Sequence, residues 1–174
     1  MAHVVLLRGV NVGGHRTFRP KQLAEQLKHL GAVNIGAAGT FVVRKNISQA
    51  KLRAEFARRL PFDTEIMICS GREISTLLAH KCFADYPPGA DIVRFVSVLS
   101  RSPRSAPALP VTLPPGGQWL VKILARDGRF VFGMYRRHMK TITYLGSLDR
   151  AFGRSTTRNW NTIAAIAKVV NNEE

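Results

Sequence analysis

The glycine-rich segment from Gly9 to Gly14 is the first place where residue types and spacing could do chemistry. Four residues separate these two glycines, which is the spacing of a phosphate-binding loop whose backbone N–H groups surround a phosphate. His15 and Arg16 stand where such a loop needs a lysine and then a serine or threonine for the nucleotide and its Mg²⁺. The sequence therefore argues against ATP hydrolysis at this loop.

Two interpretations of the loop remain open. In the first, the side chains of Arg8 and Asn11 join the backbone of Gly13 and Gly14 in holding an anionic group. In the second, the glycines let the chain leave a strand at positive φ, and no ligand is needed.

A polar cluster near the other end of the chain is the second candidate. It precedes apolar residues at helical spacing, so we expect a helix from Arg158 to Val170 with the cluster at its N-terminus. A helix start offers unpaired N–H donors and the positive end of the helix dipole, which favour an anion. The alternative is a capped helix in which threonine satisfies the backbone. The residues that could bind are Thr157, Arg158, Asn159 and Asn161.

Other catalytic chemistry has little support in the sequence. The five histidines show no metal-ligand spacing, so we expect no metal site. Asp63 and Glu65 share one face of a predicted strand, where a solvated edge pair is the favoured interpretation over acid–base catalysis. No serine has the context of an activated nucleophile. The sequence therefore assigns no catalytic residue and no cofactor, and leaves open whether the protein is an enzyme.

The N-terminal half shows strands and helices in the order β-α-β-β-α-β, which is the ferredoxin-like arrangement. Pro20 suits the first turn of one helix and Gly31 its C-terminal cap. Ser48 suits the N-cap of the second helix. The first strand is predicted at 3–10. It is followed by a helix at 21–30, strands at 33–36 and 40–45, a helix at 48–60 and a strand at 64–69.

The C-terminal half has a less regular pattern. We expect a helix from residue 72 to about 80, a strand at 92–100, and a hairpin of strands 119–125 and 129–136 around an Asp-Gly turn. The residues from Arg101 to Gly117 include five prolines, which predicts an irregular, exposed connection. Helices at about 142–152 and 158–170 complete the chain.

Charge is the clearest feature of the composition. The chain of 174 residues has 26 Lys and Arg against 11 Asp and Glu, a formal net charge of +15, and such a chain attracts polyanions. The run Arg136-Arg137-His138-Met139-Lys140, together with Trp160 next to another arginine, could form a crude nucleic-acid surface. A solvated strand end and a core tryptophan are the favoured explanation of the same residues.

The sequence also bears on the compartment. No apolar run approaches the roughly 20 residues that cross a bilayer, and the N-terminus lacks the basic region of a secretory signal. Cys69 and Cys82 show neither metal-ligand nor disulfide-scaffold spacing. We therefore expect a cytoplasmic protein with reduced cysteines and no membrane association.

Two segments carry a resemblance to a known family. They are Leu6 to Gly14 and Thr156 to Thr162, and Ser147-Leu148-Asp149-Arg150-Ala151-Phe152-Gly153 precedes the second. Together they resemble the signatures of the bacterial domain-of-unknown-function family numbered 1697. The resemblance implies an α+β fold with a ferredoxin-like N-terminal part, and it implies no activity. One departure is Ala38-Gly39-Thr40, where many members have Ser-Gly-Asn before the apolar strand.

The sequence therefore predicts an α+β protein with a ferredoxin-like subdomain at residues 1–71 and a second small α+β subdomain at 72–174. It predicts a small phosphate- or carboxylate-bearing ligand held between the two signatures. The alternative function is a basic nucleic-acid-binding module that acts through diffuse positive charge and shows nonspecific binding at low salt.

Overall fold

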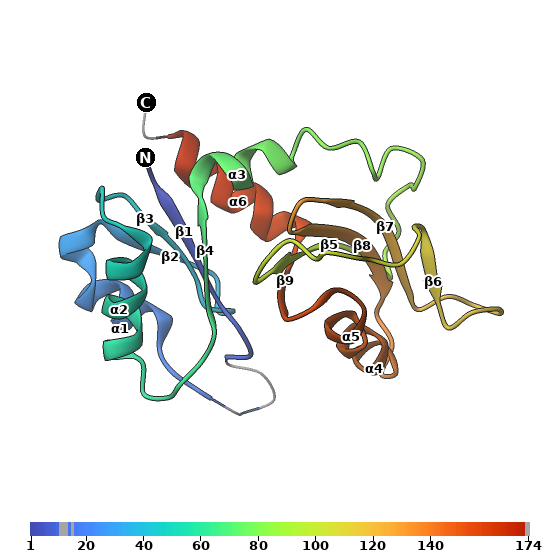
Figure 1. Cartoon of the computed structure of the whole chain (residues 1–174), viewed down its shortest axis with the longest axis horizontal. Coiled ribbons are helices and arrows are strands. Elements are labelled where there is room, and N and C mark those ends of the chain that lie inside the picture. Colours follow the sequence, from blue (N-terminus) through green and yellow to red (C-terminus); the bar gives the residue numbers. More distant parts are fainter. Residues whose placement is uncertain (11–13, 15, 173–174) are drawn as a thin grey trace. The chain divides into compact units, whose positions relative to one another are not determined.

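The computed structural model describes residues 1–10, 14 and 16–172. The chain forms two compact units, one made of residues 1–78 with 161–174 and the other of residues 79–160. Each unit combines helices with an antiparallel sheet, so the α+β class is confirmed. Figure 1 labels the elements of both units.

The first unit is built on a four-stranded sheet. Its strands have the order β2-β3-β1-β4, and all neighbouring strands are antiparallel. The expected β-α-β-β-α-β order is confirmed, with one short 3₁₀ turn (η1, Lys28–Leu30) added after the first helix. The elements are β1 (His3–Leu7), α1 (Pro20–Gln26), β2 (Ala32–Ile35), β3 (Thr40–Val43), α2 (Gln49–Arg59) and β4 (Ile66–Ser70).

Local chemistry fixes where these elements begin and end. Pro20 occupies the first turn of α1, where its missing N–H costs nothing. Gly31 ends the following 3₁₀ turn at φ +67°, a conformation that glycine adopts without strain. The Ser48 hydroxyl accepts a hydrogen bond from the Lys51 N–H at the start of α2. These three predictions from the sequence are confirmed.

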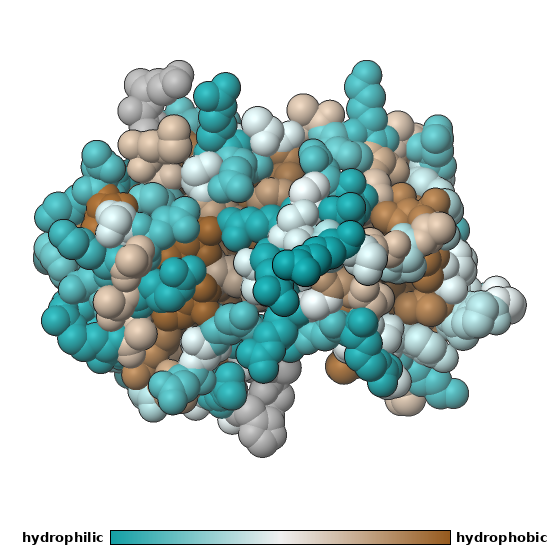
Figure 2. Space-filling view, viewed as in Figure 1, coloured by the Kyte–Doolittle hydropathy of each residue, from teal (hydrophilic) through white to brown (hydrophobic). Residues whose placement is uncertain are grey.

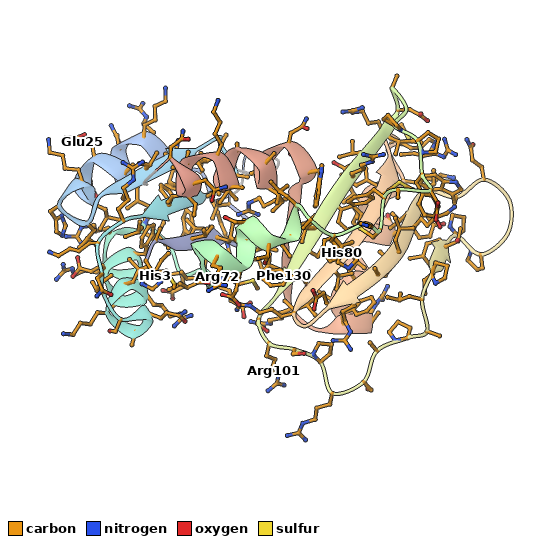
Figure 3. All side chains as sticks on the ribbon, turned by 90° about the horizontal axis from the view of Figure 1, so that it is seen from above. His3, Glu25, Arg72, His80, Arg101 and Phe130 are labelled. Carbon is orange, nitrogen blue, oxygen red and sulfur yellow. The ribbon has the colours of Figure 1, made fainter. Side chains whose placement is uncertain are left out.

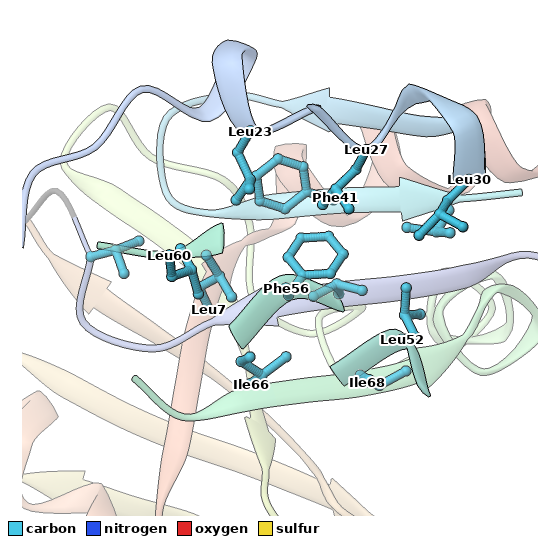
Figure 4. Close-up of a cluster of buried hydrophobic side chains, with 13 residues drawn as sticks. Leu7, Leu23, Leu27, Leu30, Phe41, Leu52, Phe56, Leu60, Ile66 and Ile68 are labelled. Carbon is cyan, nitrogen blue, oxygen red and sulfur yellow. The ribbon is translucent and has the colours of Figure 1, made fainter. Parts of the chain in front are cut away.

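Helices α1 and α2 cover one face of the sheet. The alternate residues Val5 and Leu7 of β1 face them, because successive side chains of a strand point to opposite faces. Phe56 of α2 is fully buried, and its ring meets that of Phe41 edge-on at 5.2 Å between centroids. Figure 4 shows this cluster of leucine, isoleucine and phenylalanine side chains. This core anchors the strand that leads into the first signature.

The other helices of the first unit are α3 (Gly71–Leu77) and α6 (Trp160–Asn171). A Cβ on Gly71 would lie 2.8 Å from Val170, and the Ser75 hydroxyl donates to Asn171. Both helices thus pack in the first unit, in which residues 161–174 are counted. The sequence-based boundary at residue 71 had placed them in the C-terminal subdomain instead.

The second unit is built on a five-stranded antiparallel sheet with the order β6-β7-β8-β5-β9. The expected hairpin of β7 and β8 is present, with Gly128 at φ +56° in its turn. Two short helices follow it in place of the single helix expected at about 142–152. The elements are β5 (Ile92–Leu99), β6 (Val111–Leu113), β7 (Val121–Asp127), β8 (Phe130–Arg136), α4 (Thr141–Gly146), α5 (Leu148–Phe152) and β9 (Ser155–Asn159).

The connection from Arg101 to Gly117 contains a strand that the sequence analysis missed. Val111 and Leu113 of β6 pair with β7, and with Leu109 they pack against the core of the second unit. The β-branched Val-Thr pair forms a strand although prolines flank it. The expectation of a wholly irregular segment is therefore wrong at 111–113. Arg101, at the start of the connection, extends away from the sheet (Figure 3).

Candidate functional site

The first signature follows β1. The Arg8 N–H donates to the Glu65 carbonyl, and its guanidinium lies 3.7 Å from the Glu65 carboxylate. The Thr64 hydroxyl donates to the Arg8 carbonyl. Gly14 is exposed at φ +79°, so this position needs glycine for its backbone. Asn11 and Gly13 lie outside the described residues.

The turn that departs from the family pattern packs against this signature. Gly39 has φ +80°, and a Cβ there would lie 2.7 Å from Val10 and 2.8 Å from Leu7. Thr40 follows it as a fully buried residue of β3, paired with Leu6. Residues 36–39 therefore form a tight turn that packs on the first signature, and Thr40 is built into the sheet.

The second signature is a strand, and the expectation of a helix N-terminus at Arg158 is wrong. Residues 155–159 form β9, which pairs with β5 from Leu99 to Phe95, and α6 begins only at Trp160. The consecutive threonines Thr156 and Thr157 suit a strand because they are β-branched. The backbone groups of β9 are therefore satisfied by hydrogen bonds to β5, instead of by the expected helix cap.

Alternation along β9 divides the signature between the two faces of the sheet. The Thr157 hydroxyl lies 2.6 Å from that of Ser97, directly opposite on β5. Arg158 points to the other face and is 5% exposed. Its Nη1 donates to the Thr156 hydroxyl at 2.7 Å and to the Thr157 carbonyl at 2.9 Å. Burial lowers the pKa of Arg158 to about 10.

Thr157, Arg158 and Asn159 thus lie in succession on one edge strand of the second unit, with the Arg158 side chain on the face opposite the other two. Asn159 and Asn161 are both exposed. Arg158 is the one charged residue that is buried in the described part of the chain. Arg8, Gly14 and Asn161 belong to the first unit, and the convergence of the two signatures stays a prediction.

Sequence reasoning missed two concave regions. The first unit has a groove of about 460 Å³ that Arg19 and Arg59 line together with Phe18 and Leu23. The second unit has a mostly apolar cavity of about 380 Å³ beside α5. The segment from Ser147 to Phe152, which resembles the family pattern, contributes to that cavity. That resemblance is the only signal in the sequence that points to this segment, and the sequence assigns no chemistry to it.

Among the described residues, no group of three or more His, Cys, Asp or Glu side chains could hold a metal ion. In that same part of the chain, no helix has the length and the apolar character needed to cross a bilayer.

The two cysteines are free thiols, Cys69 buried and Cys82 half-buried. Burial raises the pKa of Cys82 to about 11, so little of it is thiolate at neutral pH, and the thiolate is the nucleophile. We expect iodoacetamide at pH 8 to label both cysteines of the folded protein at least about tenfold more slowly than in urea. Labelling of Cys82 should accelerate as the pH rises toward 11. The labelling is measured by mass spectrometry. Fast labelling of Cys82 in the folded protein at pH 8 would contradict the buried environment of this thiol.

The fold and the site define a two-unit α+β protein with a glycine-rich signature after its first strand and a Thr-Thr-Arg-Asn strand in its second unit. The family described as "Protein of unknown function (DUF1697)" matches residues 1–112, and the chain belongs to that family. The first signature lies in the matched part, and the second lies beyond it.

The chain is also similar in structure to the conserved bacterial protein SP0830 from Streptococcus pneumoniae. The TM-score is 0.60 at 16% sequence identity, and the alignment covers 97% of this chain and 98% of the other. This similarity shows the fold over both units. No curated protein matches the sequence.

Proposed function

We propose that this protein binds a small phosphate- or carboxylate-bearing ligand at its second signature, with Arg158 as the charged partner of the ligand. The observation that carries the proposal is the burial of this guanidinium, which is 5% exposed. Removing a charge from water costs several kcal/mol, so a chain keeps a buried arginine only where specific contacts hold it. Strongly perturbed, desolvated ionisable groups cluster at functional sites.

The chemistry of β9 suits an anion. A guanidinium presents its N–H groups as a rigid fork that matches two oxygens of a carboxylate or phosphate. The Thr156 hydroxyl and the Thr157 carbonyl accept from Nη1 and hold the group in one orientation. A charge fixed in this way loses little conformational entropy when a ligand binds.

Thr157 and Asn159 flank Arg158 on β9, but their side chains point to the opposite face of the sheet. Their participation in binding therefore stays a prediction from the sequence. Participation of Arg8, Asn11, Gly13, Gly14 and Asn161 stays a prediction. The free thiols are compatible with a reducing compartment, and the cytoplasm stays the expected location.

Substitution of Arg158 tests the proposal. We expect Arg158→Gln to weaken the binding of phosphate or sulfate, measured by titration calorimetry, by at least about tenfold. Stability without ligand should change by no more than about 1 kcal/mol, because the glutamine amide can still form hydrogen bonds and carries no charge that must be desolvated. Arg154→Gln is the matched control, since Arg154 is exposed just before β9. Absence of saturable binding to the wild type, or equal loss in both variants, would contradict the proposal.

Nucleic-acid binding is the second candidate, and the charge of the second unit favours it. Residues 79–160 contain 13 Lys and Arg, no Glu, and only Asp85, Asp91, Asp127 and Asp149 as acids. Residues 137–140 are exposed, but Trp160 packs edge-on against Phe83 at 5.0 Å between centroids. Binding through many exposed cations should fall steeply and log-linearly with salt, whereas binding at one buried arginine should respond weakly.

A further inference from the structure

The cavity of the second unit lies on the sheet face opposite Arg158. Arg158 pairs with Val96 across β9 and β5, whereas the neighbouring Phe95 joins the core cluster that contains Ile123 and Leu148. Successive residues of a strand face opposite sides. The cavity and the proposed anion site are therefore separate. The apolar residues around the cavity are Pro107, Val111, Leu113, Ile123, Leu148, Ala151 and Phe152.

The floor of the cavity is rigid and apolar. Ile123, Leu148 and Phe152 are each at most 5% exposed, so the core holds them in place. A volume of about 380 Å³ falls in the range of small-molecule sites, which are concave, mostly apolar and largely preformed. The space-filling view shows a largely hydrophilic surface, with apolar patches that include the region of β6 in the second unit (Figure 2). Apolar surface left open to water in this way is typical of a binding site.

The one charged residue that lines the cavity is positive. Arg150 of α5 is exposed and lines the cavity together with Ser147, and no acidic residue lines it. Asp149, the nearest acid in sequence, accepts from the N–H and the hydroxyl of Ser155, each at 3.1 Å. The Asp149 carboxylate is therefore engaged with β9, while Arg150 supplies positive charge at the cavity.

We propose that this cavity binds a small amphipathic carboxylate, with the apolar body of the ligand against Ile123, Leu148 and Phe152 and its carboxylate at Arg150. Burial of the apolar body supplies about 25 cal/mol for each Å² removed from water. The arginine adds selectivity for an anion over a neutral or cationic head group. This site does not depend on the proposed function at Arg158.

Three probes with one chain length separate these contributions. Octanoate, 1-octanol and octylamine share an apolar chain and differ in head group. We expect octanoate to bind the full-length protein saturably in titration calorimetry, 1-octanol to bind at least fivefold more weakly, and octylamine to bind more weakly still. Inorganic phosphate, the probe for Arg158, should not compete with octanoate.

Two substitutions locate the site. Ala151 lines the cavity and is exposed, so Ala151→Phe should fill the space and lower octanoate affinity at least tenfold while the melting temperature of the free protein stays unchanged. Arg150→Gln should remove the preference for octanoate over 1-octanol and leave 1-octanol binding unchanged. Arg126→Gln is the matched control, because Arg126 is an exposed cation at the hairpin end of the same unit.

Several results would overturn the proposal. They are no saturable binding of octanoate to the wild type, full affinity in Ala151→Phe, and equal loss in Arg150→Gln and Arg126→Gln. If Ala151→Phe does not fold, the smaller Ala151→Leu serves the same purpose and should lower affinity at least threefold. Octanoate binding that survives both Arg150→Gln and Ala151→Leu also overturns it. Loss of phosphate binding in Arg158→Gln with octanoate binding intact separates this proposal from the proposed function.

Discussion

Replacing Gly133 by alanine is expected to destabilise the second unit by about 3 kcal/mol, the upper part of the range for overpacked cores. Gly133 lies in β8 opposite Phe95. A Cβ at this position would lie 2.5 Å from the Phe95 ring and 2.8 Å from the Lys122 carbonyl oxygen. Phe95 is fully buried and the carbonyl belongs to the β7 backbone, so neither neighbour can move away without disturbing the sheet.

Chemical denaturation followed by tryptophan fluorescence measures this effect, because Trp119 and Trp160 both lie in the second unit. Gly146→Ala is the matched control: the same methyl group at the end of α4 would meet nothing within 4 Å. A double-mutant cycle with Phe95→Leu should recover only part of the loss, since the carbonyl contact remains. A Gly133→Ala variant as stable as Gly146→Ala would contradict the close packing of β5, β7 and β8.

Most of the ferredoxin-like unit could be predicted because its signals are local. Ser48 and Gly31 mark a helix start and a helix end by their own side-chain and backbone chemistry. Leu52 and Phe56 recur at helical spacing, and both are fully buried. The alternation of β1 is likewise visible in the sequence, because each strand residue faces one side of the sheet.

The second signature shows where local reasoning stops. The polar residues Thr156 to Asn161 resemble a helix cap when only their neighbours in sequence are considered. In the fold, β5 offers an open edge, and the backbone of residues 155–159 satisfies its hydrogen bonds there. A pairing between residues about 60 positions apart leaves no local mark on the sequence, so the strand was missed.

The candidate site also has one feature that the sequence predicts and others that only the fold reveals. Arg158 could be chosen from its sequence because arginine among hydroxyl and amide side chains suits an anion. Its burial could not be predicted, since it follows from the pairing of β9 with β5. The apolar cavity also requires the fold, because β6, β7 and α5 contribute to it from distant parts of the chain.

The assignment of α6 to the first unit leads to the other large expected effect. Ile163 and Ile166 are fully buried on this C-terminal helix, and residues 161–174 join residues 1–78 in one compact unit. Each Ile→Ala change in a core costs about 2–5 kcal/mol. We therefore expect the double variant Ile163→Ala, Ile166→Ala to destabilise the first unit by at least about 4 kcal/mol.

Hydrogen exchange with mass spectrometry shows which part of the molecule is destabilised. Residues 1–78 and 161–174 contain neither tryptophan nor tyrosine, and Trp160 at the start of α6 is counted with the second unit. The amides of β1 and β3 should lose protection in the double variant, since the helix that covers their sheet no longer fills its buried positions. Lys168→Ala on the exposed side of α6 is the matched control and should change stability by less than about 0.5 kcal/mol. Protection lost in β7 and β8 but retained in β1 and β3 would instead place α6 in the second unit, as the sequence-based boundary had it. Loss of protection centred on β1 and β3 would show that α6 packs on the sheet of the first unit.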